Sequence, residues 1–326
     1  MDDRASGGDP QRSDKSRRAP PPSRADAERH ARDRLMAIGL MCVAISLFSG
    51  LDASAKYLTT HTGLPMVEIV WARFVGQFLL MLPILGALAP AALLSTRKLK
   101  FELLRSLLMV TTTACNFLAL QHLRLDQTVT VAFLAPLLVA LLAGPLLGEW
   151  VGWRRLAAIL VGFLGILIVV RPGFAGLHPA FAFAFGGMLA YSLFMLLTRY
   201  LAAYDAPIVM LFYSILLGTF ALAPFALLQW VWPASVSQWL LLLALGSLGG
   251  FGHYLFIHAY RLAPVSIVAP FLYLQLLTMV AFGYAVFGDV PDAWTLAGSA
   301  VIIGSGIYLL HRERITRAQA LRADRV

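Results

Sequence analysis

The chain has 326 residues, of which 59% are hydrophobic and only 13% are charged, and its mean hydropathy is +0.76. Because a soluble domain carries about 25% charged residues, this composition excludes a soluble protein and indicates a polytopic membrane protein. The net charge of +9 does not indicate a nucleic-acid partner, because the basic residues gather in tails and short loops rather than along one stripe.

Residues 1–34 hold nine Lys or Arg and seven Asp or Glu, together with a proline run at 20–22. Such a segment has little apolar surface to bury, so a disordered basic cytoplasmic tail is expected. The first apolar stretch starts at Leu35 and exceeds the roughly 7–15 residues of a signal-peptide core, so no cleavable signal is predicted. A second basic tail is expected at 311–326.

Ten apolar segments follow between residues 35 and 310, each long enough to cross about 30 Å of hydrocarbon. Backbone groups in lipid need partners within the protein, so each segment is predicted to be a helix. The predicted fold class is an all-α membrane protein with ten transmembrane helices. The expected spans are 35–58, 66–88, 101–121, 127–147, 153–170, 179–199, 207–229, 236–258, 264–286 and 292–310.

The distribution of Lys and Arg over the loops predicts the orientation of the chain. Loops on the side of the N-terminus hold seven of these residues, and the opposite loops hold two. The two sets are Arg97, Lys98, Lys100, Arg154, Arg155, Arg199 and Arg261 against Arg124 and Arg171. Lys and Arg favour the cytoplasmic side, so both termini are expected in the cytoplasm of a bacterium, with the chain crossing the inner membrane repeatedly.

Two opposite charges, Asp52 and Lys56, interrupt the first span, and Glu68 and Arg73 interrupt the second. The loop between these spans is short, so the helices are expected to pack antiparallel. That packing places Asp52 level with Arg73, and Lys56 level with Glu68. Unpaired charges at this depth cost about 3 kcal/mol or more, so the sequence predicts a four-charge cluster with Asp52 and Arg73 as its deeper pair.

Two roles for this cluster remain open. It can staple the helical hairpin, although desolvation offsets most of the attraction within a buried ion pair. Alternatively it binds solute through Asp52, Lys56 and Arg73, and this role is favoured. The planar Arg73 fork would then hold a carboxylate or phosphate, and Asp52 would take an ammonium group or a coupling proton. Glu68 is expected to have a structural or gating role.

Further polar residues in the predicted spans are candidates for lining a solute cavity or for forming hydrogen bonds between helices. They are Asn116, Tyr191, His253, Tyr273 and Gln275. His253 could carry a proton near neutral pH, and the tyrosines could stack on a flat ring. Glu149 and Asp289 each stand just before a predicted span, where they are expected to cap a helix N-terminus, with gating as the second possibility.

The sequence contains an internal repeat. A shift of 140 residues aligns 119–169 with 259–309 without a gap, so that Phe133 meets Tyr273 and Glu149 meets Asp289. The predicted halves, 35–172 and 173–310, then hold five spans each, and an odd number inverts the second half in the membrane. Inverted repeats are typical of secondary transporters, in which two halves enclose a site near the midplane.

The blocks that carry the repeat resemble the EamA repeat of the drug/metabolite transporter superfamily. They include "GEWVGWRRLAAILVGFLGILIVVRPG" and "FGDVPDAWTLAGSAVIIGSGIYLL". The resemblance implies an inverted five-plus-five fold, a central cavity and small-metabolite transport. "SGLDASAKYL" followed by "VEIVWARF" is similar to a bacterial branch that includes riboflavin and S-adenosylmethionine uptake carriers. Two departures are that Pro136 aligns with Leu276 and that the second-half acid is Asp289 rather than Glu.

These observations predict a secondary transporter that moves a small polar or zwitterionic metabolite by alternating access. The sequence shows no nucleotide-binding motif, cofactor motif or metal-ligand set, so energy is expected from a gradient, with a proton as the coupling ion, or from exchange. The alternative is a membrane-embedded enzyme acting on a lipid-linked substrate. It is disfavoured because Asp52 is expected towards the outside, whereas His253 and Glu149 are expected towards the cytoplasm. Substrate, direction and oligomeric state stay open.

Overall fold

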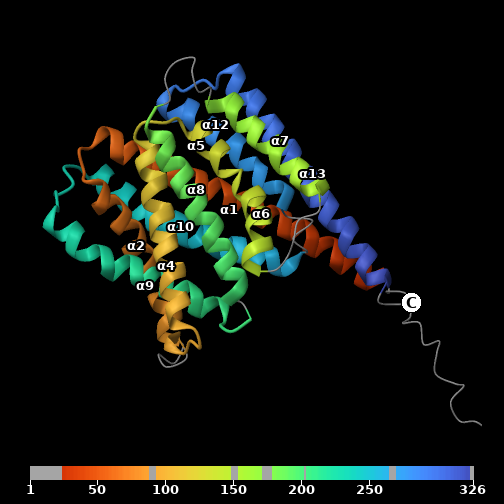
Figure 1. Ribbon diagram of the computed structural model, residues 1–326. Helices are drawn as coiled ribbons and strands as arrows, with labels where there is room; N and C mark the ends of the chain where they lie inside the picture. The colour runs from red at the N-terminus through yellow and green to blue at the C-terminus, as the bar shows by residue number, and fades with distance from the viewer. Residues whose placement is uncertain are drawn as a thin grey trace, which may run out of the picture.

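A computed structural model describes residues 24–87, 93–147, 153–170, 178–201, 203–263 and 269–323. Every regular element in these ranges is a helix (Figure 1). The helices are α1 (Arg24–His61), α2 (Met66–Ala87), α4 (Leu99–Leu120), α5 (Leu125–Ala132), α6 (Ala135–Leu147), α7 (Trp153–Val170), α8 (Ala180–Leu201), α9 (Pro207–Leu228), α10 (Val236–Leu262), the 3-10 helix η1 (Ala269–Tyr273), α12 (Leu274–Phe287) and α13 (Ala293–Ala323).

The helices coincide with the ten predicted spans. Within the described residues, six helices are long and apolar enough to cross a membrane. Four shorter apolar helices occupy the remaining predicted positions, at Leu125–Val139, Leu156–Val169, Phe271–Phe287 and Ala293–Tyr308. The prediction of an all-α membrane protein is confirmed.

The ends of the first and last helices differ from the prediction. α1 begins at Arg24, inside the segment predicted to be disordered, and α13 continues to Ala323. Residues 24–34 hold Ala, Glu and Arg but neither Gly nor Pro, and such residues favour helix. The apolar helix that follows supplies the costly nucleus, so the polar extension adds to it at little cost.

The helix contacts between the two halves come in pairs. Where a helix of one half packs against a helix of the other, their counterparts also pack together. α1 packs against α10, and its counterpart α8 packs against α4, the counterpart of α10. The α2–α10 contact is likewise matched by the α9–α4 contact. In addition, α2 packs on its own counterpart α9, and α7 runs beside its counterpart α13 (Figure 1). This is the packing expected around a pseudo-two-fold axis between inverted five-helix repeats.

Two of the predicted spans are broken at equivalent repeat positions. α5 ends at Ala132 and α6 begins at Ala135, while η1 gives way to α12 at Leu274. At these breaks the rings of Phe133 and Tyr273 meet edge to face, with centroids 5.1 Å apart. A residue can touch its own repeat counterpart only near the pseudo-two-fold axis. Both breaks therefore lie near this axis.

Glycine faces glycine where α2 crosses α10. A Cβ atom at Gly76 would lie 2.9 Å from the Cα atom of Gly246, and a Cβ atom at Gly246 would meet the backbone of Gly76 more closely still. Small residues of this kind let membrane helices approach until their backbones touch. Neither position can accept a side chain unless the two helices separate.

Gly306 of α13 makes room for the Tyr273 side chain at the second break. A Cβ atom at this position would overlap the Tyr273 hydroxyl and lie 2.9 Å from Cζ. We expect Gly306→Ala to destabilise the folded protein by about 1–3 kcal/mol, because overpacking forces the ring to move. Thermal unfolding in detergent measures this effect. Gly304→Ala is the matched control, since its Cβ would meet nothing within 4 Å; equal unfolding temperatures for the two variants would contradict the contact.

Candidate solute site

Polar side chains from both repeats meet in the middle of the bundle, and we call this set the central polar cluster. It consists of Asp52 from α1, Arg73 and Gln77 from α2, Thr113 and Asn116 from α4, and His253 from α10.

Each charge of the cluster is held by a neutral side chain of α4. The Asn116 amide donates a hydrogen bond to Asp52, with Nδ2 2.9 Å from Oδ1. The Arg73 guanidinium donates to the Thr113 hydroxyl. Asp52 and Arg73 attract each other electrostatically, but no nitrogen–oxygen contact of an ion pair joins them. The predicted deeper pair is therefore a proximity of charges and not a closed ion pair.

Two side-chain atoms of the central polar cluster are buried and have no hydrogen-bond partner among the described residues. They are the donor Nε of Arg73 and the acceptor Oε1 of Gln77. Both flank Gly249 of α10, where a Cβ atom would lie 3.7 Å from Nε and 4.0 Å from Oε1. Buried polar groups are nearly always paired with protein or ordered water. A donor and an acceptor beside one glycine are therefore suited to hold water or a polar solute.

Asp52, Arg73 and His253 are surrounded by protein that removes most of their hydration, yet each keeps part of its surface exposed. Tyr191 of α8 combines the same two properties, with 37% of its surface exposed. Side chains that line a cavity inside a helix bundle are expected to show this combination. The His253 ring packs against Phe48, with centroids 4.9 Å apart.

A cavity of about 520 Å³ opens between α2, α9 and α10 and reaches the edge of the cluster at Gln77. The rings of Tyr254 and His258 lie 4.4 Å apart in its wall, and Arg261 stands at the end of α10. This volume falls in the ordinary range for small-molecule sites, about 300–1,000 Å³.

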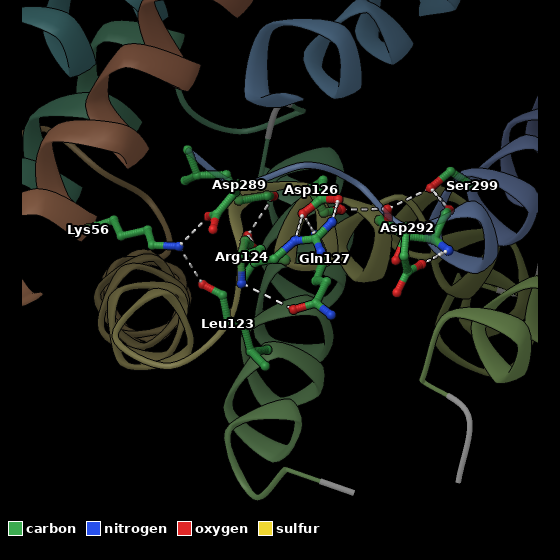
Figure 2. A network of polar contacts seen from close by, with 12 residues as sticks. Lys56, Leu123, Arg124, Asp126, Gln127, Asp289, Asp292 and Ser299 are labelled. Carbon is green, nitrogen blue, oxygen red and sulfur yellow. Dashed lines mark hydrogen bonds and ion pairs between the residues drawn. The ribbon is translucent and has the colours of Figure 1, made fainter. Parts of the chain in front are cut away.

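Lys56 does not pair with Glu68 as predicted. Its Nζ lies 3.1 Å from Oδ2 of Asp289 and 3.2 Å from the carbonyl oxygen of Leu123 (Figure 2). Glu68 instead accepts a hydrogen bond from the backbone N–H of Val231, at 3.1 Å. The prediction is wrong because equal depth does not decide which way a side chain points. Before the short loop, α1 packs along α10 and α12, and it touches α2 only slightly.

Asp289 is an ion-pair partner rather than a helix cap. The cap of α13 is Asp292, whose Oδ1 accepts from the Thr295 N–H at 2.6 Å. The Lys56–Asp289 pair therefore ties α1 of the first repeat to the loop before α13 of the second repeat. Glu149, the repeat counterpart of Asp289, lies outside the described residues.

A second polar group lies beside this tie (Figure 2). Arg124 Nε lies 3.1 Å from Oδ1 of Asp126, and this hydrogen bond is the main cause that raises the pKa of Arg124. Thr130 and Ser299 join the two repeats through their hydroxyls, 2.8 Å apart. The loops at 62–65, 121–124, 229–235 and 288–292 thus gather at one end of the molecule, which we call the 62–65 end.

The remaining predicted site residues lie apart from the cluster's hydrogen bonds. The Tyr191 ring stacks on Phe194 at 6.1 Å, and Tyr273 contacts Phe133 at the broken spans. The Gln275 amide is half-buried and makes no hydrogen bond to a described residue. The structure therefore brings together Asp52, Arg73, Asn116 and His253, whereas Lys56, Tyr191, Tyr273 and Gln275 lie elsewhere.

Several site residues were missed by the sequence analysis. Gln77 follows Arg73 by one helical turn, and Thr113 precedes Asn116 by three residues, so helical spacing could have indicated both. The sequence analysis also did not name Glu102 and Arg105, which lie outside the cluster and stand three residues apart inside the predicted span 101–121. Charges inside a span indicate function as a rule, and that signal was available.

The model of the EamA-like transporter family matches residues 35–171 and 178–311. The chain belongs to the EamA-like transporter family. This membership agrees with the repeat packing described above and with the resemblance seen in the sequence.

Several named relatives match most of this chain and most of their own length. The S-adenosylmethionine uptake transporter of Rickettsia prowazekii is 26% identical over 81% of this chain and 88% of the relative. The riboflavin transporter of Vibrio cholerae is 28% identical over 84% of this chain and 92% of the relative. The pseudopaline exporter of Pseudomonas aeruginosa is 26% identical over 84% of this chain and 96% of the relative.

One solved crystal structure shares the fold with a TM-score of 0.59 and 20% identity, over 86% of this chain and 98% of the other. The family and the named relatives make this chain a small-metabolite transporter of the membrane and not an enzyme. They also exclude the lipid-linked enzyme that the sequence left as an alternative.

Proposed function

We propose that this EamA-family chain moves a small polar or zwitterionic solute by alternating access, with the central polar cluster as its binding site. The observation that carries the proposal is the pair Asp52 and Arg73, held by Asn116 and Thr113 at the centre of the bundle without closing on each other. Charges in a membrane are costly unless they find a partner. A solute with both an ammonium and a carboxylate group would supply a partner to each.

The relatives suggest which solutes to test first. S-adenosylmethionine has an amino-acid group for Asp52 and Arg73 and a flat adenine ring for His253. Riboflavin has a larger flat ring and no amino-acid group. Because the relatives are named as uptake and export proteins, the assay has to be independent of direction.

Solute counterflow in proteoliposomes tests the proposal. Liposomes that hold the purified protein are loaded with unlabelled S-adenosylmethionine, riboflavin or an amino-acid mixture, and the labelled solute is added outside. We expect rapid exchange of a zwitterionic solute that depends on the protein. The proposed site would be contradicted if Asp52→Leu/Arg73→Met exchanged as fast as the unmodified chain.

The Lys56–Asp289 pair is proposed to hold the 62–65 end closed. Alternating access requires the repeats to part at one end at a time, and this pair joins the two repeats where they would part. Its side chains are largely shielded from solvent, with 11% of Lys56 and 27% of Asp289 exposed, so the attraction is screened less than at an open surface.

Lys56→Met and Asp289→Asn are each expected to slow counterflow about five- to tenfold, because the closed state at this end becomes less populated. The exchanged pair Lys56→Asp/Asp289→Lys restores opposite charges and should recover much of the lost rate. In a double-mutant cycle, the interaction energy between two residues in contact is about 0.5–3 kcal/mol. If the losses of the single variants simply add in the exchanged pair, the two residues do not act as a tie.

A further inference from the structure

The opposite end of the molecule contains a carboxyl group that the transport site does not use. Glu102 lies in the first turn of α4 and is 0% exposed. Treated as a carboxylate, it leaves both of its oxygens without a hydrogen-bond donor. A buried ionised carboxylate with no donor is among the costliest groups a protein can hold.

The nearest cation does not satisfy this carboxyl group. Arg105 Nη1 lies 3.9 Å from Glu102 Oε2, beyond hydrogen-bond length. The Arg105 guanidinium is directed instead at the second repeat, where it donates to the Met210 carbonyl oxygen at 2.8 Å, to the Ser214 hydroxyl at 2.9 Å and to Thr198 at 2.7 Å.

The second neighbour is another carboxyl group. The Glu102 side chain lies within hydrogen-bonding reach of Asp205, which is itself 8% exposed. Asp205 accepts from the Thr96 hydroxyl at 2.5 Å and from the Arg97 N–H at 3.2 Å. Two carboxyl groups cannot hydrogen-bond to each other unless one of them carries a proton.

The other groups around the pair supply no competing donor. Tyr213 of α9 lies close enough to both acids to interact with them electrostatically. Its hydroxyl, however, donates to the Leu94 carbonyl oxygen at 2.9 Å. Among the described residues, the charged and titratable groups that face Glu102 are therefore Arg105, Asp205 and Tyr213. A proton on Glu102 lets one of its oxygens donate a hydrogen bond to Asp205. The charges that remain are then one cation, Arg105, and one anion, Asp205.

We propose that Glu102 and Asp205 form a proton-binding site that holds the two repeats together at the end opposite the 62–65 end. Glu102, Arg105 and Thr96 belong to the first repeat, and Asp205, Met210 and Ser214 belong to the second. Loading takes one proton from water, forms one O–H bond on Glu102 and makes the hydrogen bond to Asp205. Release returns the proton to water and leaves two adjacent carboxylates, whose repulsion favours separation of the repeats.

Arg105, which neighbours Glu102, and Arg73 of the central polar cluster both lie near His253. This inference rests on the proposed transport function for its effect on flux, but the binding of the proton itself can be measured without any solute.

Infrared spectroscopy of the purified chain in detergent tests the proton directly. At neutral pH we expect a carbonyl-stretch band of a protonated carboxyl group that loses intensity in Glu102→Gln. Glu68→Gln is the matched control, since Glu68 is also 0% exposed with one unpartnered oxygen but does not touch a second acid among the described residues. A band that is the same in the unmodified chain and in Glu102→Gln would overturn the proposal.

Transport in proteoliposomes tests the coupling, with S-adenosylmethionine and riboflavin as probes. Glu102→Gln is expected to keep counterflow but to lose at least tenfold of the uptake driven by a pH gradient, because its side chain is permanently neutral. Retained dependence on the pH gradient would overturn the proposal. If the unmodified chain exchanges neither probe, the proposed solute class fails, while the infrared band still decides the proton site.

Asp205→Asn keeps the test open if Glu102→Gln does not fold. It removes the neighbouring negative charge that favours a proton on Glu102, so the protonated-carboxyl band should disappear about one pH unit lower than in the unmodified chain. An unchanged pH at which the band disappears would show that the two acids do not share a proton.

Discussion

Arg73→Met is expected to lower solute counterflow by at least tenfold while the protein remains folded. The guanidinium is the cation of the central polar cluster, and hydrogen bonds to a charged group contribute about 1.5–3 kcal/mol. Since about 1.4 kcal/mol corresponds to a factor of ten, the loss should fall between about tenfold and about 150-fold. Counterflow rates, normalised to the amount of folded protein, measure it.

Arg73→Lys separates the charge from the shape of the group. This variant keeps one positive charge but loses the planar guanidinium fork, which can reach Thr113 and a solute carboxylate together. Its counterflow rate should therefore lie between the rates of the unmodified chain and of Arg73→Met. Asp52→Leu/Arg73→Met distinguishes a staple from a site. If this double variant misfolds, the pair is structural, and if it folds but does not transport, the pair binds solute.

Gly246→Val is expected to prevent α2 and α10 from packing and to abolish the folded protein. The new side chain would meet backbone atoms of Gly76 and Gln77, which cannot rotate away as a side chain can. Overpacking by one or two methyl groups costs about 1–3 kcal/mol where side chains can adjust, and a backbone obstacle should raise that cost. Monodispersity in size-exclusion chromatography and the unfolding temperature measure the effect.

Gly39→Ala is the control for that substitution, because a Cβ atom at Gly39 meets nothing within 4 Å. It should leave the unfolding temperature unchanged or raise it slightly, since alanine favours helix by about 1 kcal/mol over glycine. A Gly246→Val protein as stable as Gly39→Ala would contradict the backbone contact between the two helices.

The spans and the repeat could be predicted from sequence because hydrocarbon imposes a simple rule. A span needs about 20 apolar residues and internal hydrogen bonds, so the segments are visible in composition alone. The breaks at Phe133 and Tyr273 were not predicted. Apolar residues continue through both of them, and only the packing of one repeat on the other reveals them.

The partners of the charges were harder to predict than the charges themselves. Depth in the membrane correctly placed Asp52 near Arg73, with which it interacts electrostatically. The same argument failed for Lys56, whose partner Asp289 lies 233 residues away in the chain. That contact depends on how the second repeat packs against α1, and no local pattern in the sequence encodes it.

Accessibility of a cysteine at Asn116 tests most directly whether the central polar cluster is a solute site. Cys42 and Cys115 are first replaced by alanine, and Asn116→Cys is then treated in proteoliposomes with a membrane-impermeant thiol reagent. The experiment is run with and without the solute that exchanges in the counterflow assay. We predict labelling from the aqueous phase that the solute slows severalfold. A cysteine at this position that is never labelled, or whose labelling the solute does not change, would contradict a solute site at the cluster.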